Sequence, residues 1–215
     1  MPFVHVPRVE LSGTLGDLTD GPDGTVSSAD REMRAVLTDR RIHPTAARVT
    51  FTYLGLTDGT DPTGSGLRLE QFGLELMAAN QCNLLTVMWR VATTSGDGPR
   101  VVRPEVVVKV KRNPNVCDGC GNAGYWEAVR WREADGVPSL LDGLPHTLTA
   151  SLRPTPAGHT LTLTADTFTG EAHLPPDRFD FVGPCGVRAD NARVHFRLFR
   201  ETADVPEGDG TSRRK

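Results

Sequence analysis

The chain has 215 residues, of which 38% are hydrophobic, 22 are Gly and 16 are Pro, a composition that suits a turn-rich β protein and argues against a helical bundle. Its 24 basic and 27 acidic residues give a formal net charge of -3, which excludes a strong positive field for holding nucleic acid or an anionic membrane surface. No run of about 18 apolar residues could cross a membrane as a helix, and residues 1–15 lack the apolar core of a secretion signal, so we expect a soluble, cytoplasmic protein.

The first candidate element, residues 28–40, fits two kinds of secondary structure. Ser28 is a good N-cap for a helix that would carry Met33, Val36 and Leu37 on one face. The same segment suits a strand equally well. We favour the strand, because the rest of the chain has the pattern of a β protein.

Apolar and polar residues alternate from about residue 48 onward, and each alternating run ends in a cluster of Gly, Pro, Asn or Asp residues. The expected strands cover residues 48–56, 67–79, 84–92, 101–112, 125–132, 146–152, 159–165, 179–181 and 192–199. The run 84–92 is apolar on both faces, which predicts a central strand. So many short strands of antiparallel type predict an all-β fold, either a two-sheet sandwich or a barrel.

These strands are expected to form one domain. No linker or internal repeat interrupts residues 1–200, and the residues 201–215, rich in Gly and charge, predict a disordered tail. The apolar sides of the alternating runs predict a set of buried core residues: Leu85, Val87, Trp89, Val106, Val108, Leu148, Leu161, Leu163, Val194 and Phe196.

The four cysteines are Cys82, Cys117, Cys120 and Cys185. Cys117 and Cys120 have the spacing of a zinc knuckle, but a structural zinc site needs two more ligands and the chain has no second close pair. We therefore expect no metal and no cofactor, with a site built from all four cysteines as the alternative, and we place Cys117 and Cys120 in a loop. We expect reduced thiols; a disulfide from Cys117 or Cys120 to Cys82 or Cys185 is the alternative for an exported protein.

The C-terminal pattern of residues 179–199, FDFVGPCGVRADNARVHFRLF, resembles the closing strands of concanavalin A-like and laminin G-like jelly-roll sandwiches. Residues 140–150, LLDGLPHTLTA, and the strand at 160–165 are similar to preceding strands of the same folds. The resemblance implies a two-sheet antiparallel jelly-roll sandwich. It also implies saccharide recognition, because lectins, glycan-binding modules, polysaccharide hydrolases and polysaccharide lyases share this fold. The paired-carboxylate motif of the retaining glucanases is missing, while Arg103-Pro-Glu105 resembles the Arg-x-Glu strand of some lyases.

Alternation places charged side chains on one side of the strand 101–112 and of its neighbours. We expect a concave binding face made by Arg90, Arg103, Glu105, Lys109, Glu127, Trp131 and His195. Its stacking ring would come from the cluster Tyr125, Trp126 and Trp131, since an indole packs well on the apolar face of a pyranose. Glu105 and His195 are the candidate catalytic residues, because a neutral histidine beside a carboxylate can act as a general base. The alternative is a solvated outer face whose charges compensate one another across strands.

Three classes of function fit these observations. The leading hypothesis is a lectin-like protein that binds a saccharide, or another small molecule, without catalysis. The second is an enzyme that uses the same face, either a polysaccharide lyase or hydrolase or an intracellular small-molecule cyclase. The third is a structural or interaction module without a small ligand. Neither nucleic acid nor a membrane is an expected partner, and the sequence leaves the oligomeric state open.

Overall fold

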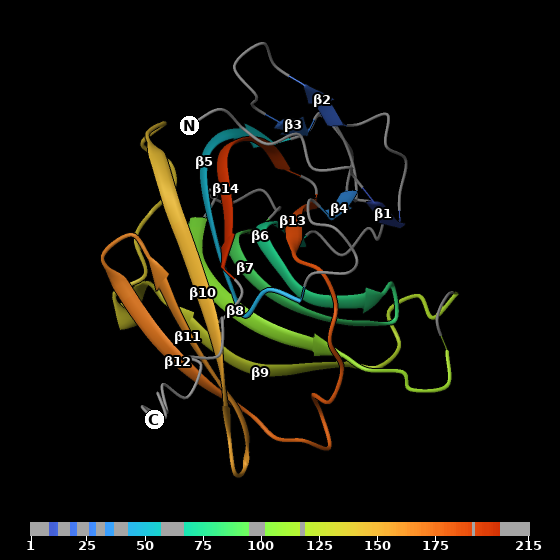
Figure 1. Cartoon of the computed structure of the whole chain (residues 1–215). Helices are drawn as coiled ribbons and strands as arrows, with labels where there is room; N and C mark the ends of the chain where they lie inside the picture. Colours follow the sequence, from blue (N-terminus) through green and yellow to red (C-terminus); the bar gives the residue numbers. More distant parts are fainter. Residues whose placement is uncertain are drawn as a thin grey trace, which may run out of the picture.

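The structure of the protein is a computed structural model that describes residues 9–12, 18–20, 26–28, 33–36, 43–56, 67–94, 102–116, 119–190 and 192–202. Figure 1 shows strands arranged in two layers, and every strand pairing in the described part of the chain is antiparallel. The all-β, two-sheet antiparallel fold expected from the alternating pattern is therefore confirmed.

Each sheet has seven described strands. Sheet A has the order β1 (Val9–Ser12), β4 (Met33–Val36), β13 (Gly186–Asp190), β6 (Leu67–Asn80), β7 (Asn83–Thr94), β8 (Val102–Lys111) and β9 (Tyr125–Arg132). Sheet B has the order β12 (Phe168–Leu174), β11 (Gly158–Ala165), β10 (Pro145–Thr155), β5 (Ala46–Leu56), β14 (Ala192–Thr202), β3 (Val26–Ser28) and β2 (Leu18–Asp20). One 3-10 turn, Glu133–Asp135, follows β9.

The structure confirms several expected strands and corrects others. The run 84–92 lies within β7, which is paired on both sides and is thus an inner strand. Within the segment 28–40, the described residues Met33–Val36 form a strand, as we favoured, and residues 29–32 and 37–40 lie outside the described residues. Among the described residues the structure contains no helix long and apolar enough to span a membrane.

The strand expected at 179–181 is wrong, because residues 179–185 belong to no strand. They follow a turn in which the Pro175 carbonyl accepts from the backbone N–H groups of Arg178 and Phe179. A strand that the pattern did not reveal, β12, precedes it. Its inward positions include the small residues Gly170 and Ala172, which weaken the apolar alternation.

The tail expected at 201–215 begins too early. Glu201 and Thr202 still belong to β14 and pair with Ala47 and Ala46 of β5, so backbone hydrogen bonding extends the strand where the side chains give no apolar signal. Residues 203–215 lie outside the described residues.

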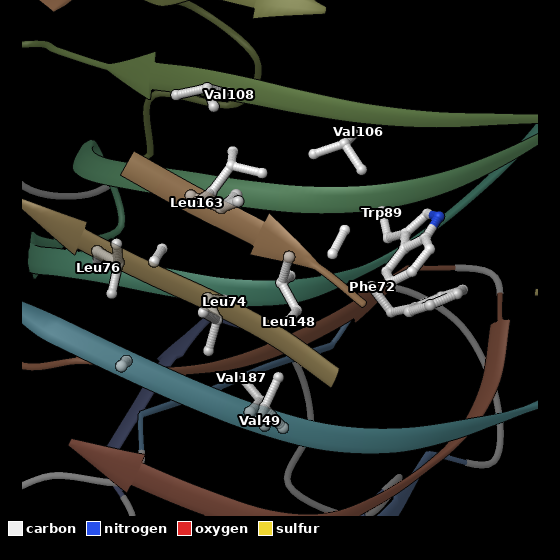
Figure 2. Packing of buried hydrophobic residues seen from close by; sticks show 14 of the residues in the cluster. Val49, Phe72, Leu74, Leu76, Trp89, Val106, Val108, Leu148, Leu163 and Val187 are labelled. Atoms are coloured by element: carbon white, nitrogen blue, oxygen red, sulfur yellow. The ribbon is translucent and has the colours of Figure 1, made fainter. Parts of the chain in front are cut away.

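The core fills the space between the two sheets. All ten residues expected there are buried, the most exposed of them, Phe196, at 3%. Figure 2 shows side chains of β6, β7 and β8, among them Phe72 and Trp89, facing Val49 and Leu148 of sheet B. The Phe51 ring meets Phe72 and Trp89 edge-on at 5.0 and 5.8 Å between centroids. This packing is what the alternating strands predict.

The expectation of reduced thiols is wrong for two of the four cysteines. Cys82, in the turn between β6 and β7, forms a disulfide with Cys120 in the loop between β8 and β9. Cys185 is free and buried, while Cys117 lies outside the described residues. The Asn83 amide donates to the carbonyls of Asn113 and Val116, which brings the two loops together. Among the described residues no group of three or more side chains could hold a metal ion.

We expect the disulfide to stabilise the fold. It joins residues separated by 38 positions, and removing a bridge of this span lowers the free energy of unfolding by about 2–4 kcal/mol through the entropy of the unfolded chain. Chemical denaturation of the double variant Cys82→Ser/Cys120→Ser measures the loss. A reductant should destabilise the wild type and leave the double variant unchanged; equal stability of both proteins without reductant would contradict the bridge.

Gly73 in β6 cannot be replaced without strain. Its φ of +154° is a conformation that residues with a Cβ rarely adopt, and a Cβ there would collide with the Val87 carbonyl oxygen in β7. We expect Gly73→Ala to lower the free energy of unfolding by about 2–3 kcal/mol. Gly136→Ala is the control, because Gly136 also has positive φ but an added Cβ meets nothing within 4 Å. Similar losses from both substitutions would contradict the close approach of β6 and β7.

Candidate functional site

Most of the charged residues singled out by the sequence lie on the outer face of sheet A, the side turned away from the core. Strand alternation puts them there because neighbours such as Leu74, Val87 and Val108 point inward. We call this surface the polar face. Its charged and polar described residues are Gln71, Glu75, Thr86, Arg90, Arg103, Glu105, Lys109, Lys111, Tyr125, Glu127, Arg130, Arg132 and Arg188.

Several charges of the polar face are buried. The exposed fraction is 0% for Glu75, 1% for Lys111, 3% for Arg90, 5% for Glu105 and 6% for Arg188. On an open, solvated antiparallel sheet such side chains would be exposed. Burying a charge is costly unless partners compensate it, so the burial itself marks this face as different from an ordinary solvated surface.

Glu105 of β8 is the centre of a charge network. Its carboxylate lies 3.3 Å from Arg130, 3.4 Å from Arg132 and 3.9 Å from Arg90, measured to the nearest guanidinium nitrogen. Arg90 comes from β7, and Arg130 and Arg132 come from β9, so the two strands beside β8 both direct arginines at one carboxylate. Such a network neutralises the buried carboxylate and fixes the arginines.

An irregularity in β9 decides which of its side chains reach the polar face. Val108 pairs with Val129, whereas the next residue of β8, Lys109, pairs with Glu127, so Ala128 is an extra residue of the bulge type. Glu127 and Arg130 consequently share the polar face. Strict alternation, which assigned Glu127 and Trp131 to one face, fails at this point.

Trp131 is therefore not part of the polar face. It pairs with the core residue Val106, packs against the core and meets the Phe168 ring of β12 at 5.6 Å between centroids. A Cβ on Gly170 would lie 2.7 Å from the Trp131 ring, so this glycine makes room for the indole. Trp131 joins β9 of sheet A to β12 of sheet B.

His195 is also separated from the other site candidates. It belongs to β14 in sheet B, where it pairs with Ser27 and Thr52. Glu105 lies on the outer face of the other sheet, so the two candidate catalytic residues cannot act on one substrate atom. The structure thus brings together Arg90, Glu105, Lys109 and Glu127, adds the exposed Arg103 at the end of the same face, and excludes Trp131 and His195.

Lys109 of β8 lies among other charged side chains of the polar face. Partial burial lowers the pKa of its ammonium group, and the nearby charges of Arg90, Arg130 and Arg188 lower that pKa further. The Glu127 carboxylate, 3.9 Å from the Lys109 ammonium group, acts in the opposite direction and raises the pKa of Lys109. The Glu127 carboxylate in turn receives hydrogen bonds from Arg130, which lower its pKa.

Sequence reasoning missed Arg188, Arg130 and Arg132. Arg188 in β13 donates a hydrogen bond from Nη1 to the Tyr125 hydroxyl (3.1 Å) and lies 3.8 Å from Glu75. A signal for Arg188 was present, because it stands between the apolar residues Val187 and Ala189 and must point away from the core. Arg130 and Arg132 depend on the irregularity in β9, which the sequence does not reveal.

Comparisons with known proteins add no identity: no family model matches the chain, and a search of curated proteins finds no match.

We expect Trp131→Ala to lower stability and leave ligand binding unchanged. A half-buried indole that joins the two sheets contributes about 2–4 kcal/mol to the free energy of unfolding. Trp131→Phe, which keeps a ring against Phe168, should lose clearly less. If a stably folded Trp131→Ala variant loses ligand binding, Trp131 belongs to the binding site and its assignment to the core side is wrong.

Proposed function

We propose that the protein binds an acidic saccharide on the polar face, without catalysis. The observation that carries this proposal is the group of charges at Lys109, which is 28% exposed and lies 3.9 Å from Glu127. Partial burial and the charges of Arg90, Arg130 and Arg188 lower the pKa of its ammonium group. An anionic group placed there relieves repulsion among the cations and accepts charge-assisted hydrogen bonds. Carboxylate and sulfate groups on a sugar have this chemistry.

The accessible part of the cluster lies between β8 and β9. The side chains of Lys109, Arg130 and Glu127 are 28%, 31% and 35% exposed, whereas those of Arg90 and Glu105 are 3% and 7% exposed. Lys109, Arg130 and Glu127 can contact a ligand directly. Arg90 and Glu105 are buried beneath them, and Glu105 holds Arg130 in position. A site with fixed donors and acceptors suits a ligand that carries both an anionic group and hydroxyl groups.

The saccharide part of the proposal rests on the resemblance of residues 140–199 to concanavalin A-like jelly rolls, which the two-sheet antiparallel fold supports only in kind. Nucleic acid is a poor alternative ligand, because the chain has a net charge of -3. The disulfide favours an oxidising compartment over the cytoplasm, and extracellular glycans are found in such surroundings.

Binding without turnover fits the geometry better than catalysis by the residues first considered. Three guanidinium groups surround the Glu105 carboxylate, which suits it to orient arginines rather than to accept a proton from a substrate. His195 stands in the other sheet. Neither residue is placed as a general base would be.

We expect Lys109→Gln to weaken binding of oligogalacturonate by about ten- to a hundredfold, the loss that follows from removing one hydrogen bond to a charged group. Calorimetric titration measures the dissociation constant. Arg153→Gln is the matched control, because Arg153 is an exposed cation of β10 in sheet B. The methyl ester of the same oligosaccharide lacks the negative charge, so it should bind weakly to Lys109→Gln and to Arg153→Gln.

The same titration at higher pH gives a second result. A bound anion raises the pKa of the Lys109 ammonium group. As the pH rises, Lys109 therefore loses its proton in the free protein before it does so in the complex. Affinity for the anion must then fall above the pKa that Lys109 has in the free protein. The fall should be absent in Lys109→Gln. Identical affinities of the wild type, Lys109→Gln and Arg153→Gln for oligogalacturonate, or no binding by the wild type, would contradict the proposed function.

A further inference from the structure

The hydrogen bond between Arg188 and Tyr125 joins strands that are not neighbours. Arg188 belongs to β13 and Tyr125 to β9, with β6, β7 and β8 between them in sheet A. Four strand intervals correspond to about 19 Å across a flat sheet, further than an arginine and a tyrosine standing upright can reach. Sheet A must therefore curve strongly toward its outer side, and Figure 1 shows the bending of β6 to β9.

The curvature explains why the middle of the polar face is closed. Gly73, Met88 and Val107 occupy the cross-strand row between Arg188 and Arg130. Met88 is 2% exposed and Val107 is 0% exposed, although both lie on the side away from the core. A Cβ at Gly73 would collide with the Val87 carbonyl oxygen, so β6 contributes no side chain to this row. The Arg188–Tyr125 pair thus forms a bridge over strands β6 to β8, where Met88 and Val107 are buried.

The two partners of the bridge differ in accessibility. The Arg188 side chain is 7% exposed, whereas Tyr125 is half-buried and so meets solvent. Glu75, fully buried on β6, lies 3.8 Å from Arg188, and the Lys111 ammonium lies 5.1 Å from the centre of the Tyr125 ring. Lys111 also donates to the Gly121 carbonyl in the loop that the disulfide holds. Glu75 therefore helps to hold Arg188 in place, and Lys111 helps to hold the Tyr125 ring.

We infer that Arg188 is a binding residue for an oxyanion of the ligand, and that the Tyr125 hydroxyl occupies this position in the free protein. A phenol oxygen is a neutral acceptor, whereas a carboxylate or sulfate forms a stronger, two-pronged hydrogen bond with a guanidinium group. An acidic ligand therefore displaces Tyr125 from Arg188, and a neutral one does not. This inference rests on the proposed function and makes the bridge a determinant of specificity for charged ligands.

The test compares Tyr125→Phe with the wild type in titrations with oligogalacturonate and with its methyl ester. The substitution keeps the ring above Lys111 and removes only the hydroxyl that the ligand must displace, so affinity for the acid should rise by about two- to tenfold. Binding of the ester should not change. Tyr53→Phe is the matched control, because Tyr53, the other tyrosine, packs on Phe72 on the core side.

Arg188 variants complete the test. Arg188→Lys keeps the charge but loses the planar fork, so it should weaken binding of the acid at least tenfold and abolish the gain from Tyr125→Phe in the double variant. If Lys109→Gln weakens binding but Tyr125→Phe leaves it unchanged or weaker, the inference is wrong and the proposed function stands. If the wild type binds no acidic saccharide, both are wrong.

Discussion

Charge buried on the outer side of a sheet is the constraint on which the rest of this molecule depends. The core between the sheets is apolar and follows the usual alternation, but Glu75, Arg90, Glu105, Lys111 and Arg188 lie buried on the opposite side. Each of these charges needs a partner, because desolvation without compensation costs several kcal/mol. The register and the curvature of the strands in sheet A must therefore keep each of these charges beside its partner.

Two local departures from regular strand geometry make that arrangement possible. The irregularity near Ala128 turns Glu127, Arg130 and Arg132 toward the polar face while Trp131 stays on the core side. Gly73 allows β6 to approach β7 more closely than a residue with a side chain could, and glycines at such positions commonly accompany sheet bending. The charge network and the curved sheet thus have identifiable causes in the backbone.

The regular alternation of side chains along the strands predicted the features that follow from it. Features that depend on an irregular strand, or on the order of strands in the sheets, could not be predicted in this way. Strand alternation was sufficient to find the core residues, the inner strand β7 and the shared placement of Arg90, Glu105 and Lys109. It could not find an extra residue in β9, so it placed Trp131 wrongly. It could not assign His195 to a sheet either, because strand order is a long-range property. The Cys82–Cys120 bridge was only one of four open pairings until the loops were placed.

The proposed binding site depends on the curved, bridged form of sheet A, in which Arg188 is buried and donates a hydrogen bond to Tyr125. The most direct measurement is the nuclear Overhauser spectrum of the free protein with assigned side chains. We expect cross-peaks between the ring hydrogens of Tyr125 and the side-chain hydrogens of Arg188. If these cross-peaks are absent and the Tyr125 ring contacts only its neighbours on β8 and β9, the sheet is flatter than described and the bridge between Arg188 and Tyr125 does not exist.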